Sequence, residues 1–331
     1  MSSRNHSYSQ NNQDDYDMNK EERDRKKHFI KENNLRLLEE GVHTAKTYII
    51  RGDAEEANKH MFSLLQEVKD DFEEAAVELL PSYFILAEAN VIMGGPRLKK
   101  AEQLLIAAYW NLLKYTSDDN KTSGIEGSSS KEVSRYRASL HKTFGRLFIA
   151  DNKLDKAIKE LSQGIYLEWM EYGPESIQLC SSYYYLASIF SKLYKKEETK
   201  SFYQKIVEIW KKHILEQEFT EEEQMKEYQI NEELYFEEAK DHLKNILGFL
   251  EVEYGPEHPL TAEWQVSFAL VMLRTGEDVV AGEFLQKAYI ILSQTLGEFD
   301  PKTKEVGDLS KKVDEMQRGH NEQLDDHEYI G

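Results

Sequence analysis

Apolar residues recur at helical spacing along most of the chain, in segments separated by short polar turns. From Leu140 to Ala157, an apolar-rich segment is followed by the turn Asp-Asn-Lys at 151–153 and then by a second segment with a small residue near its start. Stretches 186–199 and 268–281 repeat this order. Because apolar positions three or four residues apart lie on one face of a helix, the pattern predicts pairs of antiparallel helices.

The small residue near the start of each second helix measures the repeat. Successive spacings are 44, 56, 42, 40 and 42 residues, between the positions Ala57, Ala101, Ala157, Thr199, Ala239 and Ala281. A small side chain is needed there because a larger one would push two closely packed helices apart. The 56-residue spacing exceeds a 42-residue period by 14 residues, about the length of the polar, Gly/Ser-rich stretch 116–130. We therefore expect a flexible insert at 116–130.

Glycines at the joints between repeats show the same period. Gly173 and Gly255 are 82 residues apart, which is two repeats, and Gly255 and Gly297 are 42 residues apart. Glycine ends a helix in the left-handed conformation, and a following Pro or Asp-Pro begins the next helix. The two periods together predict an all-α, tetratricopeptide-like helical-hairpin solenoid of about six repeats. The fifth repeat, around 216–254, is degenerate because Glu227 takes a position that a small residue should fill.

Single-faced helices at both ends are predicted to cap this solenoid. After the last joint, Asp300 can N-cap a helix that has Pro301 in its first turn. That helix carries one apolar stripe, made of Val306, Leu309, Val313 and Met316. Near the beginning, the segment 28–50 has a similar stripe, made of Leu35, Leu38, Val42, Ala45 and Ile49. We expect the solenoid to span 28–318, between disordered tails at 1–27 and 319–331.

Composition and charge narrow the range of partners. The chain of 331 residues has 61 acidic residues and 42 Lys and Arg, a formal charge of −19. Such a balance argues against a general nucleic-acid binder and against docking on an anionic membrane. No run approaches 18 apolar residues, and residues 1–17 lack the apolar region of a secretory signal. A single cysteine, Cys180, excludes a disulfide framework and Cys-rich zinc modules. We expect a soluble protein in a reducing compartment.

The sequence lacks the usual catalytic signatures. We find no His-Glu-x-x-His, Walker A loop, Gly-x-Ser-x-Gly elbow, dinucleotide-binding glycine motif or EF-hand loop. No partner motif for Cys180 can be assigned, so a packed or half-exposed thiol is favoured over a nucleophile. We therefore expect no catalytic residue, metal site or cofactor.

Protein contact is the remaining candidate function. Peptide-binding tetratricopeptide domains place Asn and Lys or Arg on the groove face of each first helix, and the Asn ladder is missing here, which argues against a clamp for chaperone tails. Val266, Leu270 and Leu273 would expose an apolar groove unless a partner or an inserted helix covers them. The candidate protein-binding residues are Lys142, Arg146, Tyr184, Val266, Leu270, Leu273, Arg274, Glu221, Glu222 and Glu223.

The candidates Glu221, Glu222 and Glu223 belong to an acidic stretch, Glu216–Glu238, which holds ten Glu and one Lys. Either it is a docking face for a basic partner or it is a solvated helix face. This stretch carries −9 and residues 314–331 carry −5, so 14 of the 19 net negative charges lie in these two segments.

Several motifs resemble one known family. The stretch Glu78-Leu-Leu-Pro-Ser-Tyr-Phe-Ile-Leu-Ala-Glu-Ala89 is similar to the zinc finger MYND domain-containing protein 12 family, as are 100–114, 141–166, 185–190 and 207–211. The resemblance covers roughly 28–300 and is strongest over 75–212. One departure is clear: a single cysteine cannot build the zinc finger of the family name, and residues 1–27 stand in its place.

The resemblance implies a non-catalytic scaffold in the ciliary axoneme, with cytoplasm as its location before assembly. Its implied partners are a single-headed inner dynein arm, its docking subunits and a protein similar to tetratricopeptide repeat protein 29, and it would help attach the arm to the doublet microtubule. The alternative is a cytoplasmic adaptor for dynein-arm assembly or cargo transport.

Overall fold

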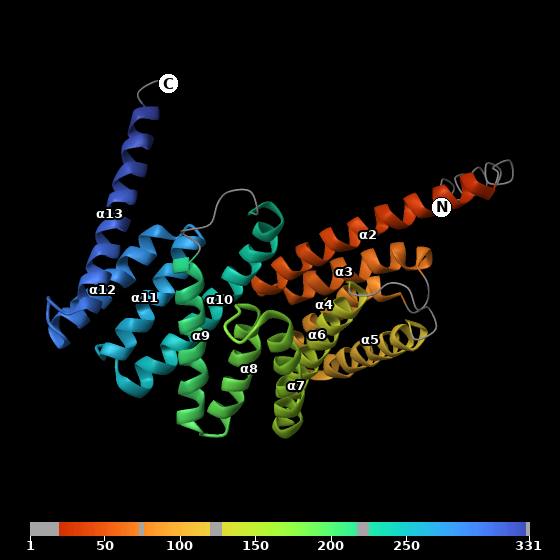
Figure 1. Cartoon of the computed structure of the whole chain (residues 1–331), viewed down its shortest axis with the longest axis horizontal. Helices are drawn as coiled ribbons and strands as arrows, with labels where there is room; N and C mark the ends of the chain where they lie inside the picture. Colours follow the sequence, from red (N-terminus) through yellow and green to blue (C-terminus); the bar gives the residue numbers. More distant parts are fainter. Residues whose placement is uncertain (1–19, 73–75, 120–127, 217–224, 329–331) are drawn as a thin grey trace. The chain divides into compact units, whose positions relative to one another are not determined.

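The computed structural model describes residues 20–72, 76–119, 128–216 and 225–328. These residues form helices joined by short turns and contain no strand (Figure 1). The chain divides into two compact units, Met1–Lys153 and Leu154–Gly331. The fold is therefore all-α, as predicted.

The first unit contains two helical hairpins and a further helix. Its α-helices are α2 (Lys20–Ile50), α3 (Ala54–Val68), α4 (Leu80–Met93), α5 (Leu98–Asp119) and α6 (Ser128–Ala150). Short 3₁₀ turns, η1 (Lys69–Asp71), η2 (Val77–Leu79) and η3 (Gly95–Arg97), join or flank them. Helix α4 packs against α2, α3, α5 and α6, and most of its residues are buried. It is the central helix of this unit because apolar residues occupy nearly its whole circumference.

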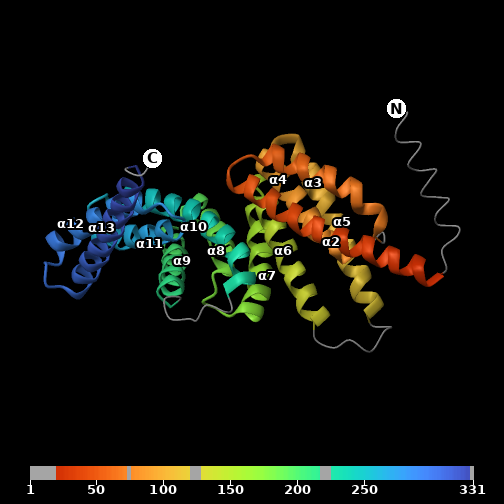
Figure 2. The same ribbon diagram turned by 90° about the horizontal axis from the view of Figure 1, so that it is seen from above.

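The second unit also contains two helical hairpins, together with three further helices. Its helices are α7 (Leu154–Tyr172), α8 (Gln178–Lys192), α9 (Lys196–Glu216), α10 (Met225–Tyr254), α11 (Pro259–Arg274), α12 (Asp278–Thr295) and α13 (Pro301–Glu328). Helices α8 and α9 form one hairpin and α11 and α12 another, and α9 also packs against α11. Helix α10 contacts α8 and α11 (Figure 2), and α13 covers α12.

The small repeat positions are all buried. None of the six residues predicted to mark helix-to-helix contacts is more than 2% exposed: Ala57, Ala101, Ala157, Thr199, Ala239 and Ala281. Two glycines within helices likewise leave no room for a larger side chain. A Cβ added to Gly41 would overlap the Leu64 side chain, and one added to Gly307 would lie 3.0 Å from the Tyr289 ring. Close helix packing therefore fixes residue size at these points.

The joint glycines and both caps are confirmed. Gly173, Gly255 and Gly297 have φ of 85°, 94° and 92°, which a residue with a side chain adopts only under strain. The Asp300 side chain accepts a 2.9 Å hydrogen bond from the backbone N–H of Lys302, as an N-cap does. In the capping helices the described stripe residues are buried or pack against the core, namely Val306, Leu309 and Val313 in α13, and Leu35, Leu38, Val42, Ala45 and Ile49 in α2. The side chain of Met316, the fourth stripe residue of α13, lies outside the described part of the structure.

The ends of the helices differ from the prediction. Helix α2 begins at Lys20 and α13 continues to Glu328, so residues 20–27 and 319–328 are helical and not disordered. Residues 20–27 are rich in Lys, Glu and Arg, which favour helix without any apolar face to reveal it. Residues 319–328 contain no Lys or Arg, and they continue the helix that the apolar stripe of α13 begins. The predicted insert at 116–130 is also partly helical, because α5 extends to Asp119 and α6 begins at Ser128. Residues 120–127 lie outside the described part of the chain.

The fifth repeat is not a hairpin. The predicted turn near Ala239 is absent, and α10 runs without interruption from Met225 to Tyr254. No Gly or Pro occurs between Met225 and Leu247, and the segment consists mostly of good helix formers, so nothing ends the helix there. The count of about six hairpins is therefore too high, since one predicted hairpin is a single helix.

Enlarging a small repeat position should destabilise the fold. We predict that Ala281→Leu, at a site that is fully buried in α12, lowers the free energy of unfolding by about 1–3 kcal/mol through overpacking. Val279→Leu is the control, because Val279 is 66% exposed on the same helix and should change the stability by less than about 0.5 kcal/mol. Equal midpoints in urea unfolding for the two variants would contradict the assigned contact.

Candidate protein-binding surfaces

Helix α10 covers the face on which the sequence places an open groove. Val266 and Leu270 of α11 are only 3% and 4% exposed, and Leu273 packs partly buried against the same core. That core also contains six buried apolar residues of α10, which are Phe236, Ala239, Leu243, Ile246, Leu247 and Leu250. Of the two occupants expected from the sequence, a partner or an inserted helix, the structure contains the inserted helix. The prediction of an exposed binding surface is wrong for Val266 and Leu270.

Tyr184 is covered in the same way. Its ring stacks on the imidazole of His242 from α10, with ring centroids 3.9 Å apart. One turn earlier, Ser181 of α8 donates a 2.7 Å hydrogen bond to the carboxylate of Glu238. Glu238 is the last residue of the acidic stretch, so the end of that stretch packs against α8 instead of lying free in solvent. The contact between α8 and α10 is therefore polar as well as aromatic.

The basic candidates on α6 and α11 also have contacts within the chain. The guanidinium of Arg146 forms an ion pair with Glu88 of α4, and both side chains are largely buried. Lys142 lies half-buried one turn before it. Arg274 is exposed, and its Nη2 donates to the backbone carbonyl of Ile214 at the end of α9. Glu221, Glu222 and Glu223 lie outside the described residues.

Cys180 is a packed residue of α8. Burial raises the pKa of its thiol well above the ordinary value, and the nearby carboxylates of Glu238 and Glu168 raise it further. A neutral, buried thiol is a poor nucleophile, which agrees with the structural role expected for it.

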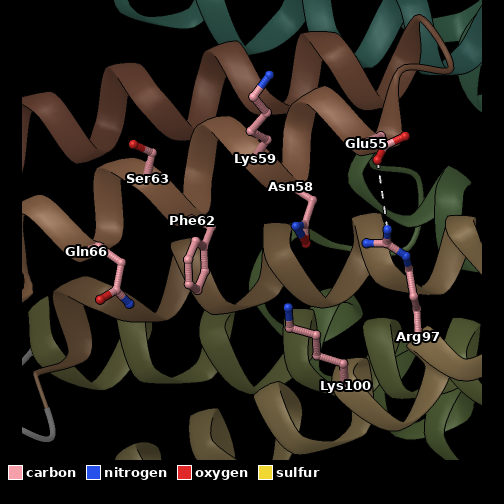
Figure 3. Close-up of a pocket in the computed structure, with 8 residues that line it drawn as sticks. All are labelled: Glu55, Asn58, Lys59, Phe62, Ser63, Gln66, Arg97 and Lys100. Atoms are coloured by element: carbon pink, nitrogen blue, oxygen red, sulfur yellow. Dashed lines mark ion pairs between the residues drawn. The ribbon is translucent and has the colours of Figure 1, made fainter.

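A groove lies between α3 and α5, the second helices of the two hairpins in the first unit. It consists of a hollow of about 520 Å³ and an adjoining one of about 310 Å³ that reaches α4. We call it the α3–α5 groove; its lining includes Asn58, Phe62, Gln66, Lys69, Asn90 and Lys100. Asn58 and Phe62 point from α3 toward the amino group of Lys100 on α5 (Figure 3).

The polar floor of this groove is formed by two asparagines. Asn90 is fully buried on α4, and its Nδ2 donates to the Leu86 carbonyl at 2.6 Å and to Asn58 Oδ1 at 2.7 Å. Asn90 Oδ1 has no hydrogen-bond partner among the described residues. A buried oxygen without a donor costs about 1–3 kcal/mol. Because an apolar residue of similar size would avoid this cost, packing alone does not account for Asn90.

Cations dominate the charge of the groove. Four basic side chains and one carboxylate line the two hollows, in a chain whose net charge is −19. Arg97 pairs with Glu55 at 3.9 Å at one end (Figure 3), and Lys59 pairs with Glu56 at 3.5 Å. Lys69 and Lys100 have no carboxylate within ion-pair distance in the described part of the chain. The Lys100 amino group lies 5.5 Å from the centre of the Phe62 ring, which is 47% exposed.

Exposed aromatic residues also mark the surfaces of α5 and α7. On α5, Ile106, Tyr109 and Trp110 are 44%, 47% and 58% exposed. In the second unit, α7 exposes Tyr166, Trp169 and Met170 in the same i, i+3, i+4 arrangement. Aromatic residues and Met are enriched at protein interfaces, so these faces are candidate contact surfaces.

Sequence reasoning missed the α3–α5 groove because it considered only the first helices of the repeats. The available signal was the outer face of α3, where Asn58, Phe62 and Gln66 follow one another at spacings of four residues. Lys100 and Asn90 could not be assigned to this face without knowing how α4 and α5 pack.

Within residues 20–72, 76–119, 128–216 and 225–328, no three His, Cys, Asp or Glu side chains gather as a metal site would require. In the same ranges, no helix is long and apolar enough to cross a membrane.

Comparison with known proteins gives a limited likeness. No protein-family model matches the chain. A kinesin light chain with nearly identical TPR-like repeats from Podosopora anserina is 16% identical over 80% of this chain and 97% of its own, with a TM-score of 0.37. BtubC (BKLC) from P. vanneervenii is 15% identical over 80% of this chain and 94% of its own, with a TM-score of 0.34. The tetratricopeptide-like fold follows from the paired helices, buried small residues and left-handed joints of the chain itself.

High pH should weaken the α8–α10 contact. Burial raises the pKa of Tyr184, and burial together with Tyr184 raises the pKa of Tyr203. Folding therefore favours the neutral phenols. Their contribution to the free energy of unfolding is complete below the unfolded pKa of about 10 and is lost as the pH rises from there toward the raised pKa of the folded state. We predict that the free energy of unfolding falls less steeply above about pH 10 in the double variant Tyr184→Phe/Tyr203→Phe than in the wild type. Parallel stability curves in urea titrations would contradict this burial.

Proposed function

We propose that the chain is a non-catalytic scaffold that binds other proteins through the exposed surfaces of its second helices. The observation that carries this proposal is the distribution of open and closed surfaces. In the second unit α10 occupies the face of α8 and α11, whereas the α3–α5 groove and the aromatic faces of α5 and α7 remain open. Surfaces of this kind suit protein partners, because a few Trp, Tyr and Arg contacts supply most of the affinity at such interfaces.

The resemblance in sequence supports a more specific proposal. We place the scaffold in the ciliary axoneme, where it is associated with a single-headed inner dynein arm and helps attach that arm to the doublet microtubule. A protein similar to tetratricopeptide repeat protein 29 and the arm's docking subunits are the proposed partners. This assignment rests on the motifs at 78–89 and 100–114 and on the others quoted with them.

The second candidate is a cytoplasmic adaptor that handles dynein parts during assembly or transport. The fold serves this role equally well, since an adaptor also needs open helical surfaces. Location separates the two candidates, because only the axonemal subunit stays with the microtubules after the membrane is removed.

Stepwise extraction of isolated cilia tests the location. We predict that the chain stays with demembranated axonemes and is released together with inner-arm dynein in high salt, because polar contacts weaken as salt screens them. Tubulin, which should remain in the pellet, and a soluble matrix protein, which should leave with detergent, are the controls. Release of the chain by detergent alone would favour the cytoplasmic adaptor.

The aromatic face of α5 should contribute to partner affinity. We predict that Trp110→Ala reduces co-precipitation of the inner-arm partner about ten-fold or more, since loss of an interface Trp commonly costs 2 kcal/mol or more. Phe299→Ala is the matched control, because Phe299 is 85% exposed at a joint. If both variants lost binding equally, the aromatic face of α5 would not be part of the interface.

A further inference from the structure

We propose that the α3–α5 groove binds an extended, acidic peptide segment of a partner protein. The inference rests on the proposed scaffold function and adds the chemistry of one of its ligands. It is carried by the donors that line the groove, by the buried asparagine beneath them and by the length of the hollow.

The length fits a short extended segment. The lining residues of α3 run from Glu55 to Gln66, which at 1.5 Å per residue is about 16 Å along the helix axis. An extended chain rises by about 3.3 Å per residue, so about five peptide residues would cover this distance.

The polar groups of the groove match an acceptor-rich ligand. Asn58 accepts a hydrogen bond from Asn90 through its own Oδ1 atom, so the Nδ2 atom of Asn58 is left to donate to a ligand. Lys69 and Lys100 can donate only, and neither has a carboxylate partner among the described residues. Carboxylates and backbone carbonyls are the groups that these donors would bind, and Asp and Glu side chains supply the charge that the two lysines lack.

The apolar part of the groove predicts one large side chain within the acidic segment. The half-exposed ring of Phe62 lies between Asn58 and Gln66 on the groove side of α3, with the Lys100 amino group near its face. An aromatic or aliphatic side chain stacked on this ring would leave Lys100 free to meet a neighbouring carboxylate. We therefore expect the ligand to have acidic residues on both sides of a Phe or Leu.

Peptide binding to the full chain tests the assignment. The probe is the fluorescein-labelled peptide Gly-Asp-Glu-Phe-Asp-Glu-Gly, with Gly-Asn-Gln-Phe-Asn-Gln-Gly as its neutral counterpart, and the readout is fluorescence anisotropy at low salt. We expect the acidic peptide to bind about ten-fold more tightly than the neutral one. Equal affinities would overturn the proposal.

Neighbouring lysines provide a matched pair of variants. Lys100→Glu should weaken binding of the acidic peptide about ten-fold. Lys99→Glu makes the same change in net charge at the adjacent exposed residue, which does not line the groove, and should weaken binding less than about two-fold. Asn58→Leu should reduce affinity about five-fold with unchanged circular dichroism. Equal effects of the two lysine variants would show that binding follows net charge and would overturn the groove assignment.

The acidic end of the chain itself is the other source of such a ligand. Neutralising the four acids of 319–331 to Asn or Gln in the full chain should leave the peptide affinity unchanged. A several-fold tighter binding in that variant would assign the groove to the chain's own end and overturn the partner proposal. If neither the wild type nor any variant binds the peptide, while the chain is still extracted from axonemes together with inner-arm dynein, this ligand is rejected. The scaffold function would then still stand.

Discussion

The structure depends on one constraint, the close approach of each second helix to its neighbours at a residue without a large side chain. Ala57, Ala101 and Ala281 are fully buried at such points, and Gly41 has no room for even a Cβ beside Leu64. Since helix separation is set by the side chains at the contact, these positions fix the spacing of the hairpins. The grooves between helices, including the α3–α5 groove, take their width from the same contacts.

Helix α10 changes how this repeated architecture can be used. A face lined by Tyr184, Val266 and Leu270 would attract a partner if it were open, but the chain covers it with its own apolar and aromatic side chains. The hydrogen bond from Ser181 to Glu238 and the stacking of His242 on Tyr184 fix the position of α10 on α8. The exposed candidate residues instead lie on second helices, as Trp110 and Lys100 do on α5.

Much of the fold was predictable from local signals, whereas the candidate binding surfaces were not. Small residues such as Ala101 and joint glycines such as Gly255 are visible in the sequence because each satisfies a local steric requirement. Helix α10 was misread as a hairpin because Ala239 keeps the period even though no turn precedes it. Asn58 and Lys100 are 42 residues apart and meet only through the packing of α3, α4 and α5, which no local pattern encodes. The same holds for the ion pair of Arg146 with Glu88.

The central claim is that partners bind the second helices while α10 stays in place. Hydrogen–deuterium exchange of the full chain, measured with and without an inner-arm partner fraction, tests it directly because exchange reports local opening along the whole chain. We predict new protection in α3 and along α5 as far as Trp110, with unchanged slow exchange in residues 239–250 of α10. Protection confined to α8 and α11, with faster exchange in α10, would contradict it by showing that the partner displaces this helix.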